Sequence, residues 1–488
     1  MALLHTGKVL AFSGSGNDPK YLTAPHPAEI FEPSEIDNDN GKVYPISNQG
    51  IEGDIFCCGH VFLPDGKILV AGGTSKYDGS SFGIPLPPFS GLNQSYLFDP
   101  VSLRWQRLAN MKYARWYPTC IMMPDGKVVT MAGLTDNFPW AILNKIEIFN
   151  QDQWETLKAD HWLPLYPRLH LLPTGEIFYA GSFNTHYTFP FNVRLFPSAT
   201  LNVNTGKWTI IGNPHNVRRE EGTTVLLPMT PSDRYAARVL LIAGGTPQGN
   251  DAIKNVEIID FSKDTPKYVD FRPLSNPRYY VYAIILPDRS ILVLGGKSGG
   301  KGHLHEESNH GHHHPEGEQP HHPDAIMEPE LLDPETNDWK RMADMKVDRL
   351  YHSNALLLPD GRVITAGSNP QRTMNELRIE IFRPPYLFRG ERPVIRKCPN
   401  KLEYGNAFEI ECSDAETIRE ICLIRPTVTT HCVNTEQRYV GLEFSKLVPK
   451  TLRAFIPSNR NLAPPGYYML FIIAEDRVPS IAQFVYLS

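Results

Sequence analysis

The sequence predicts an all-β chain in which a seven-bladed kelch-type β-propeller over residues 1–389 is followed by an immunoglobulin-like β-sandwich over residues 390–488. Three observations predict this fold. A turn followed by a short β-branched run recurs along the first part of the chain. Pairs of small residues, usually glycines, end these runs. Beyond about residue 390 the repeat gives way to alternating strands, and stretches with helical periodicity are nearly absent throughout.

The repeated turn has the signature of a β-hairpin and appears seven times. A clear copy reads LPDGKILVAGG at 63–73 and another reads LPDGRVITAGS at 358–368. A second short strand follows each copy, and a Trp closes several units. Units of about 50 to 70 residues with about four strands each are propeller blades, and the glycine pair indicates the kelch type. The irregular spacing disfavours a solenoid. The copies begin at residues 5, 63, 123, 172, 234, 286 and 358.

Two other segments differ from the repeat. From 390 to 488, turn signals at intervals of about 8–12 residues predict a small β-sandwich. Residues 299–323 hold eight of the 17 histidines and fall between the sixth and seventh blades. This composition cannot form a core, so we expect a surface insertion. A weak metal-collecting tract is the alternative interpretation.

The composition excludes several classes of protein. A formal net charge of −5 without a basic block argues against nucleic-acid binding. No apolar run approaches the ~18 residues of a membrane span. The first residues lack the features of a signal peptide, which favours either a cytoplasmic protein or a mature form. Seven cysteines are too few for a disulfide scaffold, although one pair among Cys412, Cys422 and Cys432 could bridge. We expect a monomer.

One position of the repeat carries residues that bind or modify metals. Cys57, Tyr117 and His352 each lie eight residues before the Asp of a Pro-Asp-Gly turn. A closed propeller brings equivalent positions together around one mouth of its channel. Each residue alone is most simply a core residue. Cys, Tyr and His converging on one point instead indicate a redox metal site.

The same count reaches Tyr166 and Tyr280, whose neighbours Arg168 and Arg278 are further candidates for the substrate mouth. Tyr351 precedes His352 and can share the mouth only if the strand has not yet begun. This condition arises because successive strand residues face opposite sides.

Four motifs occur in order along nearly the whole chain. They read FCCG at 56–59, ARWYPT at 114–119, RLYHSNALLLPDGRV at 349–363 and THCVNTEQR at 430–438. The closing stretch PPGYYMLFIIAEDRVPS at 464–480 accompanies them. Together they resemble the copper radical oxidases, the family of galactose oxidase and glyoxal oxidase. The Trp-Tyr-Pro form of the second motif is more similar to the glyoxal oxidases.

The resemblance implies a Cu(II) site. His352, His431 and Tyr117 would be its equatorial ligands and Tyr351 its axial ligand. A thioether between Cys57 and Tyr117 would stabilise a radical on Tyr117, so that metal and radical together remove two electrons. Tyr351 would accept the proton of the substrate. Because His431 belongs to the C-terminal domain, a loop of that domain must enter the propeller channel.

The implied reaction is the oxidation of small aldehydes of the glyoxal or methylglyoxal type, or of primary alcohols, by O2 with formation of H2O2. One alternative is a primary alcohol oxidase similar to galactose oxidase. Another is a non-catalytic kelch-type binding propeller, which would have no need of all five residues. The family is mostly secreted, so the resemblance favours an extracytoplasmic protein.

The sequence departs from the family pattern in two places. The family's galactose oxidases carry a Trp soon after the glycine pair of the tyrosine's blade, stacked on the crosslink. Here that stretch reads MAGLTDNFPW, which leaves Trp140 or Phe138 as candidates to shield the radical. Cys58 stands next to Cys57 and could compete with it for oxidation.

Overall fold

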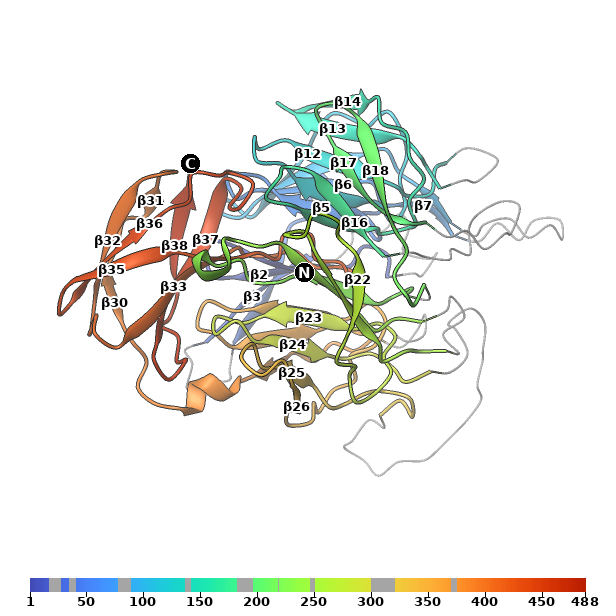
Figure 1. Cartoon of the computed structure of the whole chain (residues 1–488). Coiled ribbons are helices and arrows are strands. Elements are labelled where there is room, and N and C mark those ends of the chain that lie inside the picture. Colours follow the sequence, from blue (N-terminus) through green and yellow to red (C-terminus); the bar gives the residue numbers. More distant parts are fainter. Residues whose placement is uncertain are drawn as a thin grey trace, which may run out of the picture.

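The computed structural model describes ten stretches of the chain (Figure 1), namely residues 1–16, 28–34, 41–77, 89–136, 142–181, 196–217, 219–245, 251–299, 321–369 and 375–488. Within these ranges the regular elements are strands, apart from short 3-10 helices at Pro231–Asp233 and Pro385–Phe388. The predicted all-β class is therefore confirmed. No helix in the described ranges is long and apolar enough to cross a membrane.

The first part of the chain forms successive antiparallel sheets, each a meander in chain order except for an inserted hairpin in the second. Each of the first four sheets has four neighbouring strands. They contain β1 (Ala2–Leu3), β2 (Val9–Phe12), β3 (Ala28–Glu32) and β4 (Lys42–Ile46); β5 (Gly59–Phe62), β6 (Ile68–Ala71), β9 (Ser95–Asp99) and β10 (Arg104–Arg107); β11 (Thr119–Met122), β12 (Val128–Met131), β13 (Ile146–Asn150) and β14 (Gln153–Leu157); and β15 (Arg168–Leu171), β16 (Ile177–Ala180), β17 (Ser198–Asn202) and β18 (Lys207–Gly212). The hairpin inserted in the second pairs β7 (Thr74–Tyr77) with β8 (Phe89–Gly91).

Three more sheets continue the series. They contain β19 (Thr223–Leu226), β20 (Arg238–Ile242), β21 (Val256–Asp260) and β22 (Tyr268–Phe271); β23 (Tyr282–Ile285), β24 (Ile291–Leu294), β25 (Glu330–Leu332) and β26 (Trp339–Arg341); and β27 (Asn354–Leu357), β28 (Val363–Ala366) and β29 (Glu380–Phe382).

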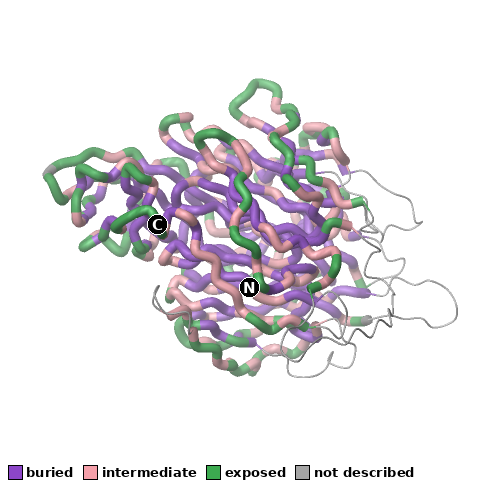
Figure 2. Tube along the Cα trace, turned by 90° about the horizontal axis from the view of Figure 1, so that it is seen from below, coloured by how far each residue is buried: buried purple, intermediate pink, exposed green. Residues whose placement is uncertain are grey.

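The innermost strands of these sheets form a ring. Strand β5 contacts β11, and contacts then run in chain order from β11 through β15, β19 and β23 to β27, which also contacts β1. Figure 2 shows that buried chain is concentrated in the interior, whereas many of the outer loops are exposed. This arrangement fits a propeller.

The glycine pair lies where neighbouring sheets approach each other closely. A Cβ at Gly72, which has a φ of +80°, would lie 2.3 Å from the carbonyl oxygen of Arg115 in the next sheet. A side chain there would force the two sheets apart, and the backbone conformation also favours glycine. At the end of this run, packing against the neighbouring sheet therefore requires a small residue.

The last part of the chain forms two facing sheets, which lie to one side of the other sheets in Figure 1. In β32 and β36 buried residues alternate with exposed ones, as expected where one face of a sheet meets a core. One sheet has the order β30 (Ile395–Lys397), β32 (Ala407–Cys412), β36 (Thr451–Phe455) and β35 (Glu443–Val448); the other has β31 (Lys401–Leu402), β38 (Gln483–Leu487), β37 (Gly466–Ala474), β33 (Ile418–Ile424) and β34 (Tyr439–Gly441). This pair of sheets fits a β-sandwich.

Residues 425–438, here named the channel loop, join β33 to β34 and enter the ring of inner strands. The loop is hydrogen-bonded to all seven inner strands. The bonds are Leu3 N to Thr427 O (3.0 Å), Phe62 N to Glu436 Oε2 (2.9 Å), Thr435 Oγ1 to Cys120 O (2.8 Å), Arg438 Nη2 to Leu171 O (2.7 Å), Thr223 Oγ1 to Cys432 O (3.0 Å), Gln437 Nε2 to Ala283 O (3.0 Å) and Thr429 Oγ1 to Asn354 Oδ1 (2.9 Å). The loop therefore ties the sandwich to every sheet of the ring.

A buried ion pair holds the base of the channel loop. Arg425 Nε lies 3.2 Å from Glu436 Oε1, and both side chains are almost fully buried. We expect Glu436→Ala to lower the free energy of unfolding by about 3–5 kcal/mol, because it leaves the Arg425 cation buried without its partner. Urea denaturation measures the loss. The control is Glu411→Ala, which removes an exposed pair with Lys397 and should cost less than about 1 kcal/mol. Equal costs would contradict this account.

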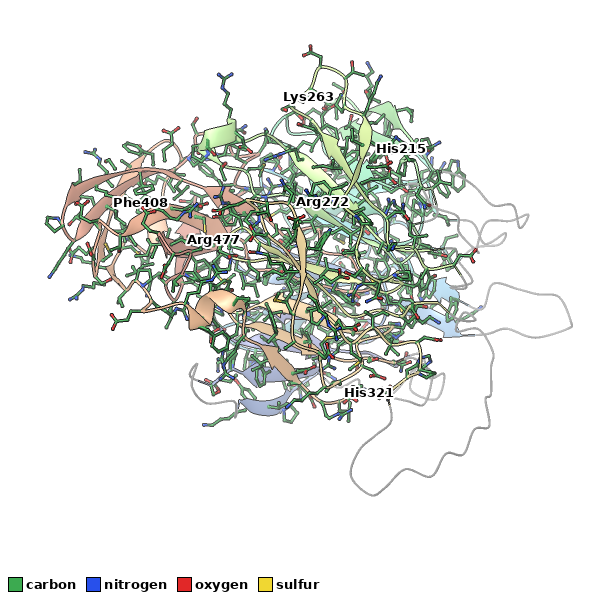
Figure 3. The ribbon with its side chains drawn as sticks, turned by 60° about the horizontal axis from the view of Figure 1, so that its bottom comes forward. His215, Lys263, Arg272, His321, Phe408 and Arg477 are labelled. Atoms are coloured by element: carbon green, nitrogen blue, oxygen red, sulfur yellow. The ribbon has the colours of Figure 1, made fainter. Side chains whose placement is uncertain are left out.

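Outside the channel, Arg477 provides a second link between the two parts of the chain. It follows β37, and Figure 3 labels it where the two parts meet. Its Nη2 lies 3.1 Å from Asp288 Oδ2, and its Nη1 lies 3.3 Å from Asp333 Oδ1. Both aspartates belong to the sixth sheet region, so this sheet is fixed to the sandwich by charge as well as by the channel loop.

Candidate metal centre

Six residues occupy equivalent positions at one end of the channel, each two residues before an inner strand. All six have positive φ angles: Cys57 (64°), Tyr117 (63°), Tyr166 (46°), Glu221 (53°), Tyr280 (67°) and His352 (63°). A left-handed backbone costs a non-glycine residue roughly 1–2 kcal/mol, and such strain gathers at functional sites. The repetition of this cost shows that the fold imposes one conformation at this position.

Main-chain hydrogen bonds connect several of these positions from one sheet to the next. The Tyr117 N–H donates to the Cys57 carbonyl (3.0 Å), and the Tyr166 N–H donates to the Tyr117 carbonyl (2.9 Å). Across the channel, the Tyr280 N–H donates to the Glu221 carbonyl (3.0 Å). Hydrogen bonds therefore join main-chain segments that carry these side chains. The six residues are named the rim residues.

Four of the sequence-predicted residues meet at one point. The hydroxyls of Tyr117 and Tyr351 are hydrogen-bonded to each other. The ring of His431 lies 4.6 Å from that of Tyr117, 4.6 Å from that of His352 and 5.5 Å from that of Tyr351, measured between centroids. Tyr351 and His352 both reach this point because they lie in a turn, and β27 begins only at Asn354.

The donor set fits a copper ion. The Nδ1 of His431 is hydrogen-bonded to Thr430 Oγ1 at 2.7 Å, whereas its Nε2 is buried and has no hydrogen-bond partner among the described residues. Burial, with a contribution from the nearby His352, holds the pKa of His431 well below its usual range, so the ring is neutral. A neutral imidazole with a free nitrogen is a metal ligand, and two imidazoles with two phenol oxygens suit Cu(II).

Cys57 lies beside Tyr117, and its buried thiol interacts with the Tyr117 side chain. Burial raises the pKa of both groups well above their usual values. All seven cysteines are unpaired, so the bridge considered among Cys412, Cys422 and Cys432 does not form in this structure.

The Tyr117 ring packs against two other aromatic rings, those of Trp116 and Tyr166. Trp116 stacks on the Tyr117 ring, with centroids 3.7 Å apart and an angle of 15° between the planes, and Phe89 in turn stacks on Trp116. Tyr166 packs against Tyr117 at 4.4 Å and donates its hydroxyl hydrogen to the Cys58 carbonyl. Trp116 thus covers the ring, while Trp140 and Phe138 lie outside the described residues.

The two arginines proposed for the mouth have different surroundings. Arg278 is fully buried and paired with Glu330 at 2.9 Å within its own sheet, so the expectation that it lines the mouth is wrong. Arg115 and Arg219 form equivalent buried pairs with Glu147 and Glu257. These pairs are a structural feature of the repeat.

Arg168 lies nearer the centre. Its guanidinium donates to the carbonyl oxygens of Tyr166 (3.1 Å) and Gly222 (2.9 Å). Its Nη2 also lies 3.9 Å from Glu221 Oε2.

Glu221 is a residue of the rim that sequence reasoning missed. The eight-residue count depends on a short turn, and the turn between β19 and β20 spans 227–237. The run GTTVLL directly after Glu221 is the signal that could have located it. Burial raises the pKa of Glu221 to about 7. Burial is the largest cause of the raised pKa of Tyr351. The charge of the Glu221 carboxylate is the second largest.

A second set of possible metal ligands lies at the surface. His215, Glu257 and Asp270 place one ligand atom each within 4.8 Å of one another, and Figure 3 labels His215 at the edge of the molecule. Glu257 already binds Arg219 and accepts hydrogen bonds from the main-chain N–H groups of His215 and Asn216. These contacts account for the set without a metal.

Comparisons with known proteins show which family the chain is similar to. The family model described as "Glyoxal oxidase N-terminus" matches residues 35–386, and the model "Galactose oxidase-like, Early set domain" matches residues 392–487. The chain is 27% identical to aldehyde oxidase GLOX of Vitis pseudoreticulata, over 93% of this chain and 85% of the relative. It is 25% identical to galactose oxidase of Gibberella zeae, over 98% of this chain and 67% of the relative.

A solved structure has the same fold. It is a fungal alcohol oxidase of the AA5 family in complex with copper, and it superposes with a TM-score of 0.79. Sequence identity is 22%, and the match covers 100% of this chain and 96% of the other. The glyoxal oxidase model by itself spans most of the present chain. The chain therefore belongs to the copper radical oxidase family, and within it to the glyoxal oxidases.

Proposed function

We propose that this protein oxidises small aldehydes to carboxylic acids with dioxygen, at a Cu(II) ion held by Tyr117, Tyr351, His352 and His431. The observation that carries the proposal is the meeting of these four side chains at one point, where the Nε2 of His431 has no hydrogen-bond partner in the described part of the chain. The named relatives, an aldehyde oxidase and a galactose oxidase, support an aldehyde or alcohol substrate. Oxidation of primary alcohols to aldehydes is the second candidate reaction.

Cys57, Tyr117 and Trp116 each have a different role in the proposed reaction. We propose that Cys57 and Tyr117 become joined by a thioether, for which their existing contact is the starting arrangement. The sulfur donates electron density to the phenol ring and so makes Tyr117 easier to oxidise. Bound copper supplies one oxidising equivalent and the oxidised Tyr117 ring the second. Trp116, stacked on that ring, excludes water from one face.

Tyr351 is placed to move the proton of the substrate. Its hydroxyl is already hydrogen-bonded to Tyr117, and Tyr280 packs on its ring at 4.8 Å. Burial raises the pKa of Tyr351 well above its usual value, so the phenolate form would require the bound copper ion. That phenolate would accept the hydroxyl proton of the substrate as a general base. The overall reaction of the hydrated aldehyde, RCH(OH)2 + O2 → RCO2H + H2O2, then balances without another cofactor.

We also propose that the seven sheets of residues 1–389 are the blades of one propeller and that residues 390–488 form an immunoglobulin-like sandwich. The ring of contacts from β5 to β27 and on to β1 supports the first part. The two facing sheets of the last part support the second. In this arrangement the channel loop places His431 at the mouth of the propeller channel, beside the rim residues.

A peroxide assay tests the proposed reaction. Protein loaded with copper in air should release H2O2 with glyoxal and methylglyoxal, and metal-free protein should release none. Faster reaction with galactose or simple primary alcohols than with any aldehyde would instead favour the alcohol oxidase. Absence of peroxide with every substrate, from protein shown to hold copper, would contradict both.

Thr430 should control copper affinity through His431. Its Oγ1 is hydrogen-bonded to Nδ1; when Nδ1–H donates to this hydroxyl, Nε2 is the ligand atom. We expect Thr430→Val to weaken copper binding about 10- to 100-fold, the usual effect of losing such a supporting partner. Titration of metal-free protein with copper measures the change. Thr430→Ser keeps the hydroxyl and should retain the affinity, and equal behaviour of the two variants would refute this role.

A further inference from the structure

We propose that Glu221 recognises the hydrated form of the aldehyde by accepting a hydrogen bond from one hydroxyl of the geminal diol. This inference rests on the proposed function and names the substrate form that the site selects. A geminal diol carries two hydroxyls on the reacting carbon, whereas a primary alcohol carries one. A carboxylate beside the proton-accepting tyrosine can therefore tell the two apart.

The position of Glu221 places it at the centre. It occupies the same repeat position as Cys57, Tyr117 and His352, with the same left-handed backbone. Its carbonyl oxygen accepts the N–H of Tyr280, the residue whose ring packs on Tyr351. Its side chain is thus presented from the rim on the side of Tyr351.

The carboxylate also has capacity for a ligand. The side chain of Glu221 is 17% exposed, so a small molecule can reach it. Its Oε2 is buried and has no hydrogen-bond partner among the described residues, because Arg168 lies 3.9 Å away and donates to carbonyl oxygens. The other neighbour of the carboxylate is the Cys432 thiol, which is only a weak donor. A buried acceptor without a donor is costly, and a substrate hydroxyl would satisfy it.

The chemistry then separates substrates by their number of hydroxyls. One hydroxyl gives its proton to Tyr351 in either substrate. Only the diol has a second hydroxyl, which donates to Glu221 while the carbon loses its hydride equivalent and O2 becomes H2O2. A site built to bind a hydroxyl discriminates strongly against an analogue that lacks it, and a hydrogen bond to a charged group corresponds to about 10- to 100-fold.

The experiment compares two substrates with one carbon skeleton, methylglyoxal and hydroxyacetone. Glu221→Leu removes both acceptor oxygens at similar size, and Glu221→Gln keeps one. We expect kcat/KM for methylglyoxal to fall about 10- to 100-fold in the Leu variant, mostly through KM, and less in the Gln variant. For hydroxyacetone it should change less than about threefold. Glu220→Gln is the matched control, because the Glu220 side chain contacts Tyr279 instead.

A binding measurement separates recognition from chemistry. Hexafluoroacetone hydrate is a geminal diol without a C–H bond, so it can bind but cannot be oxidised. Calorimetric titration should show binding to the copper-loaded wild type and to Glu220→Gln, and about tenfold or weaker binding to Glu221→Leu. Equal loss of both substrates in the Glu221 variants, or unchanged binding of the diol, would overturn the inference.

Failure of the proposed function gives a different result. If the wild type produces no peroxide from any substrate, the oxidase proposal fails, and diol binding alone then decides on Glu221. If the wild type oxidises hydroxyacetone and not methylglyoxal, the reaction class stands and the role of Glu221 is refuted.

Discussion

Cys57→Ala is expected to abolish the covalent link to Tyr117 and to reduce oxidase activity by about a thousandfold or more, equivalent to ~4 kcal/mol in the activation barrier. The Cys57 thiol already contacts the Tyr117 side chain, and both groups are buried. Formation of a thioether removes one hydrogen from each residue. Without the sulfur, the phenol ring is harder to oxidise, and the site loses its second oxidising equivalent.

Intact mass and gel mobility measure the link directly. Wild-type protein treated with copper in air should lose the mass of two hydrogens and migrate faster under denaturing, reducing conditions. Cys58→Ala is the matched control, because Cys58 is the next residue, is equally buried and is also unpaired. It should keep both changes. Loss of the link in Cys58→Ala, with retention in Cys57→Ala, would show that the wrong cysteine has been assigned.

The sequence repeat allowed several residues around the mouth of the channel to be predicted. The count from the Pro-Asp-Gly turn found Cys57, Tyr117 and His352, because equal hairpins return equal positions to the same end of the channel. The count could not reach His431, which comes from the sandwich through the channel loop. Only the resemblance of THCVNTEQR to the family motif located it.

Glu221 and Trp116 were missed for physical reasons. Glu221 has the same backbone conformation as the other rim residues, but its hairpin is longer, so the count failed. Trp116 precedes Tyr117, and neighbours in a strand would face opposite sides. The left-handed conformation of Tyr117 breaks that alternation and lets the two rings stack.

The repeat also predicts a wrong position for one charged side chain. Arg278 lies two residues before Tyr280, so its position in the repeat predicts that it lines the mouth of the channel. The structure instead pairs it with Glu330 of the third strand of its sheet. A buried arginine needs such a partner, and the partner lies some 50 residues away in the sequence, where register counting gives no information.

His431→Ala is expected to weaken copper binding by at least about 100-fold and to remove oxidase activity, because it deletes the ligand that only the channel loop supplies. The His431 ring lies 4.6 Å from both Tyr117 and His352, so a water cannot reproduce its position and its directed lone pair. Copper titration of metal-free protein measures the affinity, and peroxide release measures activity. His170→Gln is the matched control, since His170 is also a buried imidazole bonded to a threonine, Thr224, but lies outside the centre.

The result decides where copper binds. If His431→Ala keeps the affinity of the wild type and unfolds at the same temperature, the centre described here does not hold the metal. The surface set of His215, Glu257 and Asp270 and the histidine-rich residues 299–323 would then be the next candidates to test. His215→Ala separates them, because it removes one ligand of the surface set and leaves the histidine-rich segment intact. Loss of affinity in His431→Ala alone, with an unchanged unfolding temperature, assigns copper to the mouth of the channel and makes the channel loop part of the active site.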